Sequence, residues 1–192
     1  MHLIEKIDQL DKQLFIFLNQ FHSPLSDTIM VFFTEKQTWI PFYALIIIYF
    51  FWKFHWKGFW PILGILFTIL LADQFASGFC KPFFERLRPC HNPEISVLVH
   101  ITEKGCGGSY GFISSHAANT FGLAMFLFLF FRRRMQYAAW IFLWSGLVSY
   151  SRIAVGVHYP TDIILGALSG MLWAYISFRL FSTLTKKYQL SY

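Results

Sequence analysis

Charged side chains are scarce in this sequence of 192 residues. Asp, Glu, Lys and Arg make up 14% of it, about half the usual share in a soluble domain, whereas hydrophobic residues make up 56%. The 24 phenylalanines and 7 tryptophans suit a lipid-facing surface with aromatic belts at its edges. The composition therefore excludes an ordinary soluble domain and predicts a membrane protein. The length predicts a single domain over residues 1–192.

Two further absences narrow the class of protein. Residues 1–12 are polar and carry acids, so no cleavable signal peptide is expected and the first span itself directs the chain to the membrane. No internal repeat is visible, which disfavours a transporter built from inverted repeats. The net charge of +6 does not indicate nucleic-acid binding here, because the Lys and Arg residues lie in short loops where they set membrane topology.

Cysteine is also rare, and the three cysteines cannot all pair. Cys90 and Cys106 flank one polar loop, while Cys80 ends an apolar run. If that loop faces an oxidising compartment, Cys90 and Cys106 can form a disulfide; otherwise they are free thiols.

Five apolar segments approach the roughly 20 residues that a membrane-spanning helix needs. They are residues 38–54, 59–79, 115–131, 136–156 and 161–181. We therefore expect an all-α, polytopic membrane helix bundle.

Residues 1–35 are expected to form an amphipathic N-terminal segment. Residues 4–21 alternate charge and apolar bulk at helical spacing, as in a helix that lies in the membrane interface. Residues 24–35 are too short to span, and include Pro24 and Asp27. The alternative is that they join the preceding segment as a sixth, broken span, so that five to six transmembrane helices are expected.

The positions of the basic residues predict the orientation. Those between the first two spans, between the third and fourth, and after the last belong on the cytoplasmic side: Lys53, Lys57, Arg132, Arg133, Arg134, Lys186 and Lys187. The connections 80–114 and 150–160 then face outward. The loop 80–114 nevertheless holds cations that topology does not explain, namely Lys81, Arg86, Arg88 and Lys104.

Three polar stretches lie at the outward ends of the spans. They are Lys81–Pro89, Ser114-Ser115-His116 and Ser151–Asp162. Because the topology puts all three on one side of the membrane, we expect them to form one site.

The cations in these stretches predict that the site binds an anion. Lys81, Arg88 and Arg152 supply fixed positive charge, and the planar fork of arginine matches the oxygens of a phosphate. Ser114 and Ser115 lie where a helix begins, so free backbone N–H groups can face the anion there.

Two histidines suffice for a covalent phosphoryl-transfer cycle. His158 and Asp162 are four positions apart, and a carboxylate that takes one ring N–H leaves the other nitrogen more nucleophilic. We expect His158 to attack phosphorus, and His116 to protonate the leaving oxygen and later activate water. A metal site would need more ligands than His91, His100 and the cysteines offer at this spacing, so no metal is expected.

The order and spacing resemble the signature of the type 2 phosphatidic acid phosphatases: Lys-x6-Arg-Pro, Pro-Ser-Gly-His and Ser-Arg-x5-His-x3-Asp. The first and third elements are matched by Lys81, Arg88, Pro89, Ser151, Arg152, His158 and Asp162. In the second, Ile113 replaces Pro and Ser115 replaces Gly, while Ser114 and His116 are kept. The resemblance implies a helical membrane fold, a phosphohistidine intermediate, no metal or cofactor, and lipid phosphates or pyrophosphates as substrates.

We therefore expect a metal-independent lipid phosphatase in the cytoplasmic (inner) membrane of a bacterium, with its site facing the periplasm or exterior. Candidate substrates are a polyprenyl pyrophosphate, phosphatidylglycerol phosphate, phosphatidate and lipid A. The first is slightly favoured, because that carrier is recycled on the inferred active side. The alternatives are a phosphotransferase using the same site and an anion-binding transporter. Asp73, inside the second span, is expected to pack within the bundle, and Arg86 to lie at the rim.

Overall fold

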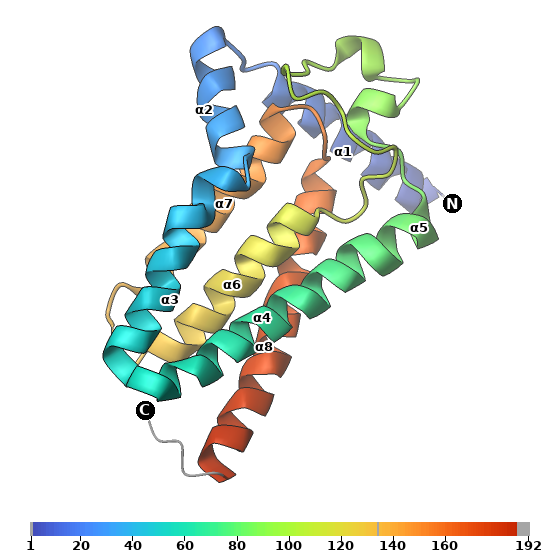
Figure 1. The fold of residues 1–192 in the computed structure, drawn as a ribbon. Helices are drawn as coiled ribbons and strands as arrows, with labels where there is room; N and C mark the ends of the chain where they lie inside the picture. Colours follow the sequence, from blue (N-terminus) through green and yellow to red (C-terminus); the bar gives the residue numbers. More distant parts are fainter. Residues whose placement is uncertain (1, 134, 188–192) are drawn as a thin grey trace.

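The protein is a bundle of helices in a computed structural model that describes residues 2–133 and 135–187 (Figure 1). These described residues contain no strand, only an isolated bridge between Leu87 and Tyr110. The expected all-α fold is confirmed.

Five long helices occupy the positions of the expected spans. They are α3 (Ile40–Phe54), α4 (Phe59–Asp73), α6 (Ser115–Phe131), α7 (Ile141–Ala154) and α8 (Pro160–Lys187). Short 3₁₀ turns precede or join them: η1 (Gln37–Trp39), η2 (His55–Gly58) and η6 (Ala138–Trp140). The fourth span therefore starts later than residue 136, and the last runs beyond residue 181.

Two helical segments of the described chain are long and apolar enough to cross a membrane, namely Gln37–Phe84 and Pro160–Lys186. The first contains α3 and α4, which form a hairpin around η2 (Figure 1). Ser115–Phe131 is apolar but shorter. Large apolar side chains face outward along the bundle, among them Leu45, Ile48, Leu66, Leu168 and Leu172, as lipid contact requires.

Helix α6 lies at the centre of the bundle and packs against α4, α7 and α8. Its contact with α8 is close because glycines let the two backbones approach. A Cβ atom added to Gly170 would overlap the carbonyl group of Ala118, and one added to Gly166 would lie 2.6 Å from the carbonyl oxygen of Ser114. Small residues serve the same purpose in membrane helix pairs generally.

The second span ends later than expected. Helix α4 continues as a π-helix, η3 (Gln74–Cys80), and then as α5 (Lys81–Phe84). The outward loop therefore begins at Glu85, whose left-handed backbone (φ 47°) ends the helix, and not at residue 80. The expectation was wrong here because Lys81 reads as a loop residue in the sequence, whereas its ammonium group is satisfied inside the protein.

The N-terminal residues form two separate helices, α1 (His2–Asn19) and α2 (Pro24–Thr34), rather than one broken span. Ser23 caps α2, accepting a hydrogen bond from the amide of Ser26. In Figure 1, α1 lies across one end of the bundle, and α2 stands above α3.

Helix α1 turns its polar side inward. Asp11 is only 4% exposed, whereas Ile4 is 75% exposed. A soluble surface helix would do the reverse, so this arrangement fits a helix with its apolar face in the membrane interface.

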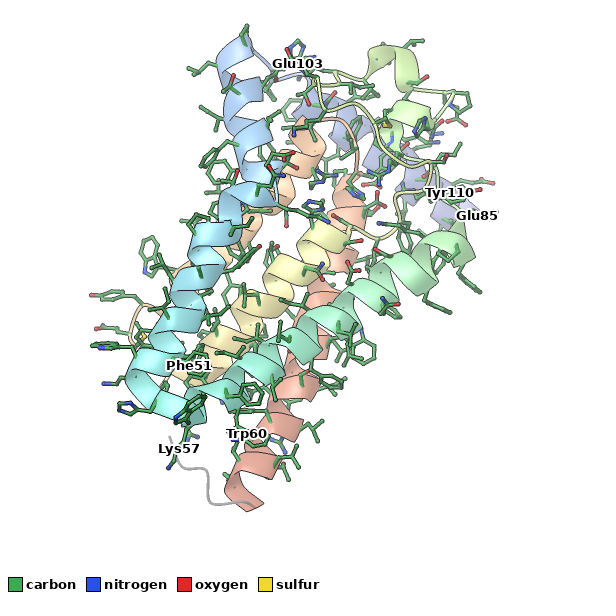
Figure 2. All side chains as sticks on the ribbon, viewed as in Figure 1. Phe51, Lys57, Trp60, Glu85, Glu103 and Tyr110 are labelled. Atoms are coloured by element: carbon green, nitrogen blue, oxygen red, sulfur yellow. A yellow bond between two sulfur atoms is a disulfide. The ribbon has the colours of Figure 1, made fainter. Side chains whose placement is uncertain are left out.

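The connection from Glu85 to Ser114 covers the same end of the bundle as α1. It contains two 3₁₀ turns, η4 (Pro89–His91) and η5 (Ser96–Leu98). A disulfide joins Cys90 to Cys106, which was the first of the two alternatives for these cysteines. Figure 2 shows Glu85, Glu103 and Tyr110 at this loop end, with Phe51, Lys57 and Trp60 at the opposite end.

Candidate active site

A cavity of about 420 Å³ lies where the three polar stretches meet. Its wall includes residues from all three: Lys81, Arg88, Ser115, His116, Arg152 and His158. Deeper in the bundle the wall becomes more apolar, with Trp39, Tyr43, Ile69 and Leu123. Six of the eight expected site residues are thus brought to one space.

Lys81 and Ser115 form one side of the cavity. The Lys81 ammonium donates to the Ser115 hydroxyl at 2.9 Å, and Ser115 also shares a hydrogen bond of 2.7 Å with Ser77. Ser77 lies in the π-helix one turn before Lys81, so the irregular segment aims both side chains at the start of α6. Such segments occur frequently at functional sites.

Arg88 and Arg152 keep spare hydrogen-bonding capacity. The Nη1 atom of Arg88 donates to the carbonyl of Val157 at 3.5 Å, and that of Arg152 donates to the Thr34 hydroxyl. The Nε–H of each guanidinium is buried and has no partner among the described residues. Buried donors of this kind ordinarily find an acceptor, and a phosphate could supply one to both.

Ser114 does not reach the cavity, contrary to its expected role as a phosphate ligand. Its side chain is fully buried and caps α6, accepting from the amide of Ala117 at 3.4 Å. Its own amide donates to the Asp162 carbonyl at 3.0 Å. The start of a helix needs a cap, and the Ser114 hydroxyl supplies it here.

His158 lies in the short connection between α7 and α8 and is 1% exposed. Its Nδ1 atom is 3.4 Å from Asp162 Oδ2, and the backbone of Gly111 also hydrogen-bonds the ring. With Nδ1 engaged, Nε2 is the nitrogen left for the cavity. Burial, and then the charges of Arg152, Arg88 and Lys81, hold the pKa of His158 well below its usual value, which keeps the imidazole neutral.

Gly111 fits closely between the groups around His158. A Cβ atom there would lie 3.2 Å from Arg88 Cγ, 3.3 Å from Asp162 Oδ2 and 3.6 Å from His158 Nδ1. Glycine therefore allows the loop backbone to reach the imidazole. In the sequence, this position was only one of several glycines in a loop.

Asp162 is fully buried behind His158 rather than in the cavity wall. It accepts from the amide of Tyr159 at 3.0 Å and from Arg86 Nη1 at 2.9 Å, both shorter than its contact with His158. Arg86 was expected at the rim, but its side chain is largely buried and pairs with this carboxylate. It is the main residue of the site that the sequence analysis missed.

His116 lies in the first turn of α6 and lines the cavity together with His158. The structure gives its ring no hydrogen-bond partner within the described residues. An acid and base that must exchange protons with a bound ligand needs such freedom.

A second cavity, of about 380 Å³, lies on the loop side of the same residues. It shares Thr34, Lys36, Arg88, His116 and Arg152 with the first, and adds Lys104 and the glycines at 105 and 107. His116, Arg88 and Arg152 thus lie between a partly apolar space in the bundle and a polar space under the loop.

Two other groups contain three metal-ligating side chains within the described part of the chain. In one, Cys90 and Cys106 are already joined to each other beside His91. In the other, the rings of His22 and His100 are stacked 3.7 Å apart, with Asp27 bonded to His100. Neither group includes a residue that lines the first cavity, although Cys106 lines the second.

Comparison with known proteins agrees with this geometry. The model of the PAP2 superfamily matches residues 62–186, which cover all the cavity residues from the three motifs. The chain belongs to the PAP2 superfamily. It is a membrane phosphatase of the PAP2 type, a hydrolase of phosphoric monoesters, as the motif spacing predicted.

Several curated proteins resemble the chain over most of its length. The lipid A 4'-phosphatase of Bacteroides thetaiotaomicron is 41% identical over 190 residues, covering 97% of this chain and 84% of that protein. That of Porphyromonas gingivalis is 36% identical, covering 93% and 75%. The undecaprenyl-diphosphatase of Sulfolobus acidocaldarius is 29% identical, covering 89% and 78%.

Solved PAP2 structures share the fold. Aquifex aeolicus LpxE superposes with a TM-score of 0.61 at 26% identity, over 87% of this chain and 93% of that one. The PAP2-type phosphatidylglycerolphosphate phosphatase of Bacillus subtilis gives 0.64 at 23% identity, over 95% and 87%. The latter likeness concerns the fold alone.

Proposed function

We propose that this PAP2 phosphatase hydrolyses a phosphate monoester of lipid A at the outer face of the cytoplasmic membrane, through a phosphohistidine at His158. The observation that carries the proposal is the single cavity that joins both histidines and three cations to a partly apolar space within the bundle. A phosphate would occupy the cationic end, and the lipid would extend along the apolar part.

The residues divide the reaction as follows. The Nε2 atom of His158 attacks phosphorus while the ester bond to the leaving oxygen breaks, and His116 gives that oxygen a proton. Water then attacks the phosphohistidine, His116 takes a proton from it, the P–N bond breaks and inorganic phosphate leaves. Lys81, Arg88 and Arg152, with the Ser115 hydroxyl, stabilise charge spread over the three transferring oxygens. No step in this scheme uses a metal or cofactor.

The two cavities suit two kinds of traffic. Lipid would approach from the bundle side, where Tyr43, Ile69 and Leu123 line the wall. Water and released phosphate would use the loop side, where Lys36 and Lys104 offer charge. The alternating basic residues support a loop end that faces the periplasm or exterior.

The sequence alone slightly favoured a polyprenyl pyrophosphate as substrate. Two observations now favour lipid A. The relatives at 41% and 36% identity are both lipid A 4'-phosphatases. In addition, Asp73 lines the first cavity, of about 420 Å³, where it accepts a hydrogen bond from Asn119 at 3.0 Å. A second phosphate continuing toward the lipid would meet this carboxylate, whereas a sugar hydroxyl or amide would find an acceptor.

A panel of purified lipids tests the proposal. We expect phosphate release from 4'-phosphorylated lipid A, without an added acceptor and in the presence of EDTA, and much less from a polyprenyl pyrophosphate, phosphatidylglycerol phosphate or phosphatidate. The His158→Ala variant should release none. Preference for the pyrophosphate would overturn the substrate assignment, and dependence on an added acceptor would indicate a phosphotransferase.

A further inference from the structure

Arg86 connects the buried Asp162 to the N-terminal helix. Its Nη1 atom donates to Asp162 Oδ1 at 2.9 Å and to the Thr161 hydroxyl at 2.8 Å. Its Nη2 atom donates to Asp11 Oδ2 at 2.8 Å and to Asp8 Oδ1 at 3.1 Å. One guanidinium thus bridges the first turn of α8 and the middle of α1.

Helix α1 also binds the start of α8 directly. Asp11 accepts hydrogen bonds from the amide of Thr161, at 2.9 Å, and from its hydroxyl. The Arg86 guanidinium lies 4.1 Å from the centre of the Tyr159 ring, which follows His158 in the chain. Polar groups of α1 are therefore used for holding residues 159–162, while its apolar side chains face outward.

A second connection runs through the backbone of Arg86. Its carbonyl accepts from the amide of Gly111 at 2.9 Å, and Gly111 is the residue whose backbone hydrogen-bonds the His158 ring. The side chain of Arg86 thus fixes Asp162, and its main chain fixes the loop on the other side of the same imidazole.

We propose that Arg86 is a positioning residue that holds Asp162, and through it His158, in place, and that α1 anchors Arg86 through Asp8 and Asp11. The inference rests on the proposed role of His158 as nucleophile. It assigns the interfacial helix a part in the reaction although α1 lies outside the cavity wall.

Electrostatics give Arg86 a second effect. An unpaired carboxylate at the position of Asp162 would be buried and uncompensated. Burial alone would lower the pKa of Arg86, but Asp162, Asp11 and Asp8 together outweigh it and raise that pKa, so the guanidinium stays charged. Without the charge of Arg86, the Asp162 carboxylate would favour the imidazolium form of His158. The other charged groups that face this ring favour its neutral form; they are Lys81, Arg88, Arg152 and His116 when protonated.

The test compares single-turnover phosphoenzyme formation from an aryl phosphate across pH, in the full-length protein. Arg86→Gln should lower the maximal rate by roughly 10²-fold, the effect of a small misplacement of a reacting group, and should move the acid limb to higher pH. Arg86→Lys keeps the charge without the fork, so its acid limb should stay near that of wild type while its rate is intermediate. Asp11→Asn should slow the reaction less than Arg86→Gln.

Glu94→Gln is the matched control. Glu94 accepts a hydrogen bond from Lys12 of α1 at 2.7 Å, so Glu94→Gln weakens one contact of α1 and leaves the contacts of Arg86 with Asp8, Asp11 and Asp162 in place. We expect rate and pH profile to stay near wild type. A loss at Glu94→Gln equal to that at Arg86→Gln would overturn the inference, and so would an unchanged rate and acid limb in folded Arg86→Gln.

Two outcomes remain distinct. If wild type forms no phosphohistidine, the proposed function itself fails before any variant is compared. If Arg86→Gln does not fold, Arg86→Lys and Asp11→Asn decide, and wild-type kinetics in both would contradict the positioning role.

Discussion

At the scale of single residues, substitution of His116 should slow the reaction by a factor that depends on the leaving group, whereas substitution of His158 should abolish it for every substrate. His158 is buried and held at Nδ1, whereas the His116 ring is free to exchange a proton. The aryl oxide of an aryl phosphate leaves as a stable anion, but the alkoxide of a lipid phosphate needs a proton to leave. The substrate therefore reports which histidine is the acid.

We expect His116→Ala to slow phosphoenzyme formation from an alkyl lipid phosphate by roughly 10²–10⁴-fold, the usual contribution of general acid catalysis. The loss on p-nitrophenyl phosphate should be much smaller. Single-turnover kinetics must be used, since His116 also activates water in the second step. Equal losses on both substrates would rule out the assigned role.

The sequence was informative where residue type and short spacing suffice. Lys81, Arg88, His116, Arg152 and His158 were all expected to meet, and they do. The role of Arg86 was not predicted, because its acidic partners in α1 lie 75 and 78 positions away and no local sequence pattern relates them. The Ser114 hydroxyl was misassigned because capping and phosphate binding favour the same residue type at a helix start.

At the scale of elements, the contact between α6 and α8 fixes the histidines relative to each other. His116 lies in the first turn of α6, and His158 lies just before α8. Gly166 and Gly170 allow the close approach of these helices. The five spans were predictable from apolar runs, but the π-helix was not. Its Ser77 hydroxyl bonds to Ser115 at the start of α6, which is 38 positions away in the sequence.

Gly170→Ala should therefore destabilise the bundle. The added methyl group would overlap the Ala118 backbone, which cannot move as a side chain can, and overpacking of this kind costs about 1–3 kcal/mol. Thermal unfolding in detergent should show a lower Tm and reduced activity. Gly146→Ala on α7 is the control, since its new methyl group meets nothing within 4 Å. Equal Tm values for the two variants would show that the helix contact is looser than described.

At the scale of the whole molecule, the protein has two chemically different ends. The loop end carries α1, the disulfide and the cavity, whereas η2 and the residues after α6 lie at the other (Figure 1). The basic residues at that second end predict that it faces the cytoplasm.

Cysteine labelling in intact cells checks this orientation. In a Cys80→Ala background, where the other native cysteines are joined, Ser109→Cys should react with a membrane-impermeant reagent and Arg133→Cys should not. Both positions are exposed in the structure, so accessibility alone does not separate them. Labelling of both from outside would refute the topology.

The most direct test of the central claim is to trap the phosphoenzyme and locate its phosphate. The purified protein would be mixed with ³²P-labelled lipid A 4'-phosphate, quenched within one turnover under alkaline conditions that preserve phosphohistidine, and mapped by mass spectrometry. The account predicts phosphate on His158, with more accumulating in a variant whose second step is slowed. Phosphate on His116, or turnover without any phosphohistidine, would contradict it.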